Sequence, residues 1–139
     1  VVFRGWHSSS ALLIFTDRRS EKIKHLVCNP NAEILWFFIK SKTQFRFKGK
    51  INELVENEKY WKKLSDESKS SWFWEYPRKK ISTDFQFNCE VPKNLNPPKN
   101  FVVLKFQILS VDILKLEKPI HKRYILEKKY GWKKVEVNP

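Results

Sequence analysis

The sequence predicts a mainly β domain: a small antiparallel, Greek-key-like barrel, closed or split, with short helices in its connections. Strand-like segments, which either alternate apolar and polar residues or are apolar throughout, make up most of the chain. Their order is strands, one short helix, strands, helices and strands again, unlike the regular alternation of a parallel α/β fold. With 139 residues, 15% aromatic and 31% charged, residues 1–139 are expected to form one domain with a substantial core.

The first strands are expected on both sides of a short turn. Apolar runs at 1–6 and 11–16 flank the turn at 7–10, which predicts a hairpin. A further run at 32–39 is almost entirely apolar, so we expect a strand that is buried on both faces.

The strand expected at 43–52 alternates clearly. Phe45 and Phe47 point to one face, and polar side chains occupy the other: Gln44, Arg46 and Lys48. Gln44 offers both a donor and an acceptor, which suits the edge of an amide-like heterocycle; an ordinary solvated strand face is the alternative. Gly49 is expected to permit a bulge or a close backbone approach.

A short helix is predicted at about 20–28. Three apolar residues at positions i, i+3 and i+4 support it: Ile23, Leu26 and Val27. Ser20 or Asp17 is expected to cap its start, and Asn29-Pro30 ends it.

The turn that precedes this helix has the composition of an anion site. Arg18, Arg19 and Lys22 gather at the positive end of the helix dipole, where first-turn amides also lack intrahelical partners. A bound dianion, such as a phosphate, would relieve the repulsion and use the amides. The alternative is three solvated surface cations in a lysine-rich protein.

Helices and then strands are expected in the second half. Two short helices are predicted at 54–64 and 66–74, followed by an irregular segment at 75–100 that holds Pro77, Pro92, Pro97 and Pro98. A strand at 101–109 is expected to continue at 111–116 after a bulge near Ser110. The segments at 121–127 and 132–137 are expected to form a closing hairpin.

The net charge of +13 indicates an anionic partner such as nucleic acid or an anionic ligand. The lysines are scattered, however, and no basic stripe is present. Trp72-Phe73-Trp74 is either a stacking platform for bases or, as we favour, a core or dimer contact. Nucleic acid is therefore expected less than a small anion.

Several other classes of protein are not supported. The chain has no hydrolase motif, no zinc spacing and only three glycines, too few for a dinucleotide-binding loop. No metal site is expected. No membrane span or signal peptide is visible, so a cytoplasmic location is expected, with Cys28 and Cys89 as free thiols and one disulfide as the alternative. The chain contains no Met and opens in an apolar run, which suggests a missing N-terminal segment.

These features together resemble the pyridoxamine 5′-phosphate oxidase-like family, whose members share an FMN-binding split β-barrel. The resemblance is greatest to its uncharacterised FMN-binding branch from cyanobacteria and other bacteria. The matching positions are Phe15, Thr16, Asp17, Ser20, Lys22, Asn29-Pro30, Gln44 and Gly49, and later His121, Arg123, Trp132 and Asn138-Pro139. The match extends over the whole chain and is poorest at 75–100.

The resemblance implies roles for particular residues. Phe15 and Thr16 would lie beside the flavin, and Ser20 and Lys22 would contact its phosphate. Gln44 would approach the ring, and Arg123 would contact the flavin from the last strands. The implied assembly is a homodimer with FMN at the interface, acting on an unknown small molecule. A family N-terminal helix and strand would precede Val1.

The chain also departs from the oxidase pattern. Glu21 stands where the oxidase has a second basic residue, a role that Arg18 or Arg19 is expected to take. Leu114 replaces a flavin-contacting Trp, and Pro119 replaces a substrate-binding Arg. The residues that hold pyridoxal phosphate have only loose counterparts in Tyr60 or Trp61.

The resemblance therefore implies an FMN-binding flavoprotein and possible oxidoreductase rather than a pyridoxamine phosphate oxidase. Three alternatives stay open at this point: a flavin carrier or sensor without turnover, a deazaflavin in place of FMN, and a basic nucleic-acid-binding barrel.

Overall fold

The computed structural model describes residues 1–81 and 96–139; Cys89, Pro92 and the middle of the predicted irregular segment lie outside them. The strands are β1 (Phe3–Ser8), β2 (Ala11–Asp17), β3 (Asn31–Phe38), β4 (Thr43–Leu54), β5 (Phe101–Lys115), β6 (Lys122–Glu127) and β7 (Val135–Val137). The helices are α1 (Glu21–Cys28), α2 (Glu58–Trp61) and α3 (Asp66–Ser70), with the 3₁₀ turns η1 (Ser71–Phe73) and η2 (Lys128–Tyr130). The predicted mainly β fold with short helices is confirmed.

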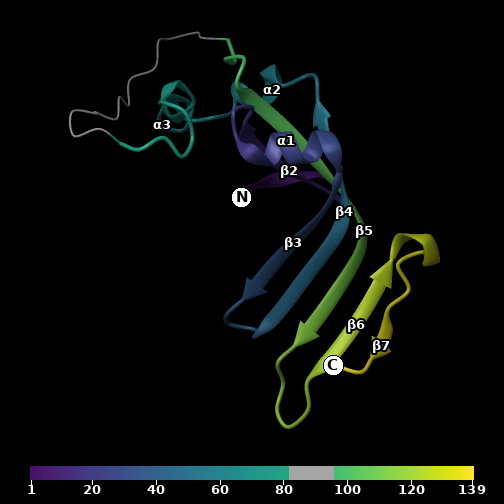
Figure 1. Cartoon of the computed structure of the whole chain (residues 1–139). Coiled ribbons are helices and arrows are strands. Elements are labelled where there is room, and N and C mark those ends of the chain that lie inside the picture. Colours follow the sequence, from purple (N-terminus) through teal and green to yellow (C-terminus); the bar gives the residue numbers. More distant parts are fainter. Residues whose placement is uncertain (82–95) are drawn as a thin grey trace.

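The long strand β5 organises the sheet (Figure 1). One of its edges pairs with β4 along almost its whole length. Its other edge pairs first with β2, over 101–107, and then with β6, over 110–115. All these pairings are antiparallel, and the order β1-β2-β5-β4-β3 does not close into a ring, as expected of a split barrel.

A bulge divides β5 into two halves. The register steps from Lys48 opposite Ser110 to Gly49 opposite Ile108, so Leu109 is the extra residue. A Cβ placed on Gly49 would lie 2.0 Å from the carbonyl oxygen of Gln107, which leaves room for glycine alone. The predicted bulge and close approach are both confirmed.

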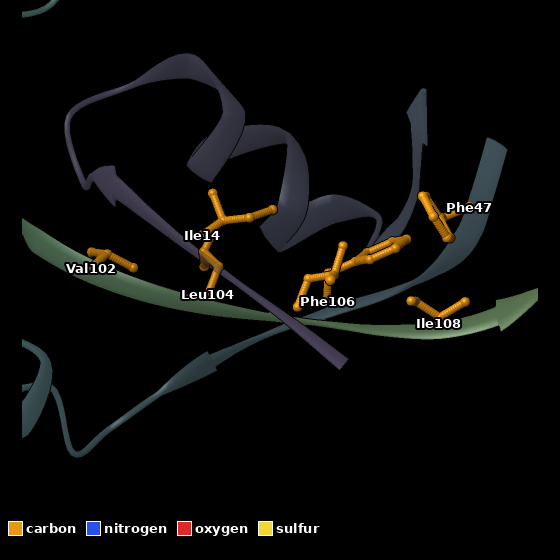
Figure 2. Close-up of a cluster of buried hydrophobic side chains, with 7 residues drawn as sticks. Ile14, Phe47, Val102, Leu104, Phe106 and Ile108 are labelled. Carbon is orange, nitrogen blue, oxygen red and sulfur yellow. The ribbon is translucent and has the colours of Figure 1, made fainter. Parts of the chain in front are cut away.

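Two clusters of buried side chains cover opposite faces of the sheet. The first lies inside the barrel, between β5 and α1, and contains Ile14, Phe47 and Phe106 (Figure 2). Ile23 and Leu26 of α1 pack against it. The second joins Leu13 and Val103 to the helical segment through the buried ring of Trp61.

Two expectations about local structure were wrong. Strand β3 is not buried on both faces, because it lies at the edge of the sheet and leaves Leu35 59% exposed. The helix expected at about 20–28 is confirmed as α1, which presents Ile23 and Leu26 to the core and leaves Val27 82% exposed. The predicted helix at 54–64 shortens to α2, because β4 continues to Leu54.

The segment Trp72-Phe73-Trp74 packs against the core. Trp72 packs edge-on against Phe101, with ring centroids 5.0 Å apart, as the core interpretation predicted. None of the helices in 1–81 and 96–139 is long and apolar enough to cross a membrane.

Candidate functional site

Three of the predicted site residues meet where β2 gives way to α1. Lys22 donates from Nζ to Oγ1 of Thr16 at 3.0 Å, and the hydroxyls of Thr16 and Ser20 lie 3.5 Å apart. Thr16 and Ser20 are buried, whereas Lys22 is exposed. This group, which we name the phosphate turn, holds two hydroxyls and one ammonium at the start of a helix.

The start of α1 has no side-chain cap. Ser20 is the N-cap residue, as predicted, with an extended backbone at φ −76° and ψ 147°. Its hydroxyl, however, donates back to the carbonyl of Asp17 at 2.7 Å and makes no capping hydrogen bond. The positive end of the helix therefore faces outward without the usual side-chain acceptor.

The two arginines of the turn point away from the phosphate turn. Arg18 forms an ion pair with Glu53 at the end of β4, and its Nε donates to the carbonyl of Lys99 at 3.3 Å. Arg19 forms an ion pair with Asp17 at 2.7 Å and donates to the carbonyl of Trp74 at 3.2 Å. Of these three cations, Lys22 is thus the one that donates to a hydroxyl of the phosphate turn.

Asp17 is the anchor of this region. It accepts from the side chain and the backbone amide of Arg19, and from Nδ2 of Asn100 at 2.9 Å. Burial alone would raise the pKa of Asp17, but the hydrogen bonds from Arg19 and Asn100 outweigh it and hold the pKa below its ordinary value. Asn100 also donates to the carbonyl of Trp72 at 2.8 Å, which ties η1 to the turn.

Glu21, the departure from the oxidase pattern, is paired with an arginine from elsewhere in the chain. Its carboxylate forms an ion pair with Arg78. Arg19 also lies over the ring of Tyr76, 4.9 Å from its centroid. The segment after η1 therefore packs against the first turn of α1.

Gln44 and Arg123 share one row across the sheet, far from the turn. In the register, Phe37 lies opposite Gln44, Gln44 opposite Leu114, and Leu114 opposite Arg123. Directly opposed residues point to the same face, so Leu114 lies between the side chains of Gln44 and Arg123. We name these three residues the cross-strand row.

Beside the row, charges alternate over four neighbouring strands. Glu33 on β3 pairs with Nε of Arg46 on β4 at 3.0 Å. Arg46 lies opposite Asp112 on β5, and Asp112 accepts two hydrogen bonds from Arg123 on β6, at 3.0 and 2.6 Å. The hydrogen bonds from Arg123 lower the pKa of Asp112 below its ordinary value, although burial opposes them.

Phe15 lies on the other face of β2 from Thr16 and lines a pocket of about 410 Å³. Its ring packs against Tyr60 and Phe101 at 5.8 and 5.4 Å, and the guanidinium of Arg4 lies 5.8 Å from its centroid. His7 and Lys63 also line this pocket, and none of its described lining residues is acidic. The surroundings of Phe15 thus suit an anion with a flat body.

Sequence reasoning missed Asp112, Asn100 and Arg4. Asp112 and Asn100 act through long-range pairings, because Asp112 meets Arg123 only through the β5–β6 register. Arg4 carried a local signal, since it lies on the strand expected before the turn.

Comparison with known proteins supports the resemblance. Residues 1–55, which include the phosphate turn and Gln44, match the family model for the pyridoxamine 5′-phosphate oxidase FMN-binding domain. A curated relative is the pyridoxine/pyridoxamine 5′-phosphate oxidase 2 of Arabidopsis thaliana, 38% identical over 74 residues. That match covers 52% of this chain and 37% of the plant protein, just over a third of its length.

Solved structures extend the likeness over the whole fold. A pyridoxamine 5′-phosphate oxidase-related FMN-binding protein from Nostoc punctiforme aligns with a TM-score of 0.86 and 27% identity, covering 99% of this chain and 78% of the other. PhzG from Burkholderia lata, solved with tetrahydrophenazine-1-carboxylic acid, shares the fold at TM-score 0.79 and 17% identity, covering 99% and 72%. The predicted resemblance of this chain to the pyridoxamine 5′-phosphate oxidase-like, FMN-binding split-barrel family is confirmed.

Proposed function

We propose that this chain is a homodimeric FMN-binding flavoprotein that carries out two-electron transfer on a small anionic molecule. The observation that carries the proposal is the phosphate turn: Thr16, Ser20 and Lys22 meet at an uncapped helix start, inside the segment that matches an FMN-binding domain. FMN would supply the redox chemistry, and the protein would supply anchoring and electrostatic tuning.

The phosphate turn fits the phosphate of FMN in both charge and hydrogen bonding. Lys22 supplies a positive charge, the hydroxyls of Thr16 and Ser20 can donate, and the helix start has no side-chain cap that would compete with an anion. In this proposal Arg18 and Arg19 support the turn through Glu53 and Asp17 rather than by contacting the phosphate.

The cross-strand row fits the ring of a flavin. Gln44 has a donor and an acceptor for the polar edge of the ring, and Leu114 offers an apolar surface between Gln44 and Arg123. Arg123 is expected to donate to a ring oxygen or nitrogen. In this proposal the ring therefore meets the row through one polar edge and one apolar face.

The spacing of the two groups supports a site shared by two chains. Thr16 lies opposite Val102, whereas Gln44 and Arg123 flank Leu114 near the far end of β5. At about 3.3 Å per residue, the strand between Val102 and Leu114 is roughly 40 Å long. The short sugar-alcohol chain of FMN cannot span that length. The turn of one copy and the row of its partner would together hold one FMN.

The pocket beside Phe15 is the proposed place for the substrate. Its lining brings together Arg4, His7 and Lys63 with the rings of Phe15 and Tyr60. Cations around an aromatic wall favour a flat molecule that carries a carboxylate or a phosphate. This pocket opens on the side of β2 opposite to Thr16.

The first test is the visible absorption spectrum of the purified protein, followed by release and identification of its chromophore. We expect a yellow protein that releases FMN. Release of a deazaflavin would mean that the proposed site binds a deazaflavin in place of FMN. A colourless protein that takes up no added FMN would contradict the proposal. If its binding to nucleic acid then fell steeply with added salt, the basic-barrel alternative would be favoured.

A second test addresses the shared site. One variant carries Lys22→Ala and Ser20→Ala, and the other carries Gln44→Ala and Arg123→Ala. Each variant alone is expected to bind FMN weakly. After the two are unfolded together and refolded, mixed dimers would contain one intact site each, so about a quarter of all sites should regain FMN. No recovery in verified mixed dimers would contradict a site built from both chains.

A further inference from the structure

Asp112 holds Arg123 by a two-point contact. Nε of Arg123 donates to Oδ1 at 3.0 Å, and Nη2 donates to Oδ2 at 2.6 Å. The carboxylate is 15% exposed and the guanidinium side chain 36%. A two-point arginine–carboxylate pair fixes the plane of the guanidinium as well as its position, and one hydrogen bond does not.

The pair leaves part of the guanidinium available. An arginine has five N–H groups, and Asp112 uses two of them. No other residue in 1–81 or 96–139 accepts a hydrogen bond from Arg123. The remaining N–H groups are therefore open to a bound molecule on the same sheet face as Gln44 and Leu114.

Asp112 also lowers the positive field of Arg123. Across the sheet the charges run negative, positive, negative, positive, from Glu33 through Arg46 and Asp112 to Arg123. Hydrogen bonds from Arg123, and the nearby charges of Arg46 and Lys48, hold the pKa of Asp112 below its ordinary value. An aromatic ring placed against Arg123 would therefore meet a guanidinium that is partly balanced by a carboxylate.

We propose that Asp112 is a positioning residue that orients Arg123 toward the flavin ring and sets how strongly Arg123 favours the reduced flavin. This inference rests on the proposed function. A positive charge beside a flavin stabilises the negative charge that the ring gains on reduction, so it raises the midpoint potential. By balancing Arg123, Asp112 holds that potential down.

Three variants test the proposal. Asp112→Asn keeps the shape of the side chain and removes its charge, so the midpoint potential of bound FMN is expected to rise. Asp112→Ala also releases the guanidinium, so FMN affinity is expected to fall by about tenfold, the equivalent of one charge-assisted hydrogen bond. Glu33→Gln is the matched control, because it removes a carboxylate from the same charged face without touching Arg123.

The measurements are FMN titration of the apo-protein and spectroelectrochemistry of the holoprotein. A potential in Asp112→Asn equal to those of the wild type and Glu33→Gln would overturn the proposal. If Asp112→Ala does not fold, the midpoint potential of FMN bound to Asp112→Asn decides the test. A wild type that binds no flavin would overturn the proposed function and this inference together, whereas a flavin-bound wild type with an insensitive Asp112 would overturn this inference alone.

Discussion

The phosphate turn and the cross-strand row differ in how the chain builds them. The turn is local: Thr16, Ser20 and Lys22 lie within a few residues, and a strand end and a helix start bring them together. The row is assembled at long range, since Gln44, Leu114 and Arg123 come from three different strands. A local group can be recognised from sequence, but a row exists only once the register is fixed.

The two regions also use charge differently. Around the turn, Arg18 and Arg19 form ion pairs with carboxylates, and Lys22 donates to the hydroxyl of Thr16. Beside the row, the charges alternate across the sheet and Arg123 keeps free donors. In the proposed site, the turn therefore offers the single ammonium of Lys22 to a phosphate, and the row offers a partly balanced guanidinium to a ring.

The largest expected effect falls on the bulge that joins the two regions. Gly49→Ala would place a methyl group against the carbonyl of Gln107 and is expected to destabilise the fold by about 3 kcal/mol. Urea unfolding monitored by circular dichroism measures this loss. Gly131→Asn is the control: Gly131 has φ 65° and open space around it, and asparagine tolerates that conformation. Equal stability of the two variants would show that the close approach at Gly49 does not matter.

The next largest effect concerns the turn. Lys22→Ala is expected to weaken FMN binding by about 2 kcal/mol, the scale of a lost charge-assisted hydrogen bond. Lys24→Ala is the matched control on the same helix, because Lys24 is exposed and lies outside the phosphate turn. Quenching of flavin fluorescence on titration measures both affinities. The phosphate assignment is wrong if the two variants bind FMN equally well.

Substitution of Arg19 distinguishes a role in stabilising the turn from direct contact with the phosphate. Arg19→Ala leaves Asp17 without its main partner and is expected to destabilise the fold by about 1.5 kcal/mol. Its FMN affinity should change less than that of Lys22→Ala. Arg18→Ala, which breaks an exposed pair, is the control, with a stability change below about 0.5 kcal/mol. A loss of affinity in Arg19→Ala as large as in Lys22→Ala would return Arg19 to the phosphate site, as the sequence predicted.

The smallest expected effect is a dependence on pH. The pKa of Asp17 is lowered in the folded state, so its contribution to stability is fully present above the ordinary value of 3.8. The contribution is lost as the pH falls below 3.8 and through the lowered pKa. Asp17→Asn should therefore flatten the acid side of the stability profile, measured as thermal midpoint against pH. Asp66→Asn, at an exposed position, should leave the profile unchanged.

Sequence reasoning predicted most of the fold because its signals were local. The hairpin, the helix start at Ser20 and the bulge at Gly49 each follow from a few adjacent residues. The exposed face of β3 could not be predicted, since an apolar strand has the same pattern at the edge and at the centre of a sheet. The motif predicted that Ser20 and Lys22 would lie together at the helix start, but it did not predict that Arg19 and Arg18 would form ion pairs with Asp17 and Glu53.

The bulge at Leu109 gives β5 two opposite parities. Before it, the even-numbered residues Leu104, Phe106 and Ile108 point into the barrel; after it, the odd-numbered Val111 does. The inward and outward positions along β5 therefore depend on the presence of one extra residue in the strand. If Leu109 were instead paired within the ladder, with no bulge, Val111 would turn outward and Asp112 would turn toward the apolar interior. One extra residue, whose side chain is 37% exposed and belongs to neither buried cluster, thus decides which face of the sheet the polar residues of the second half of β5 occupy.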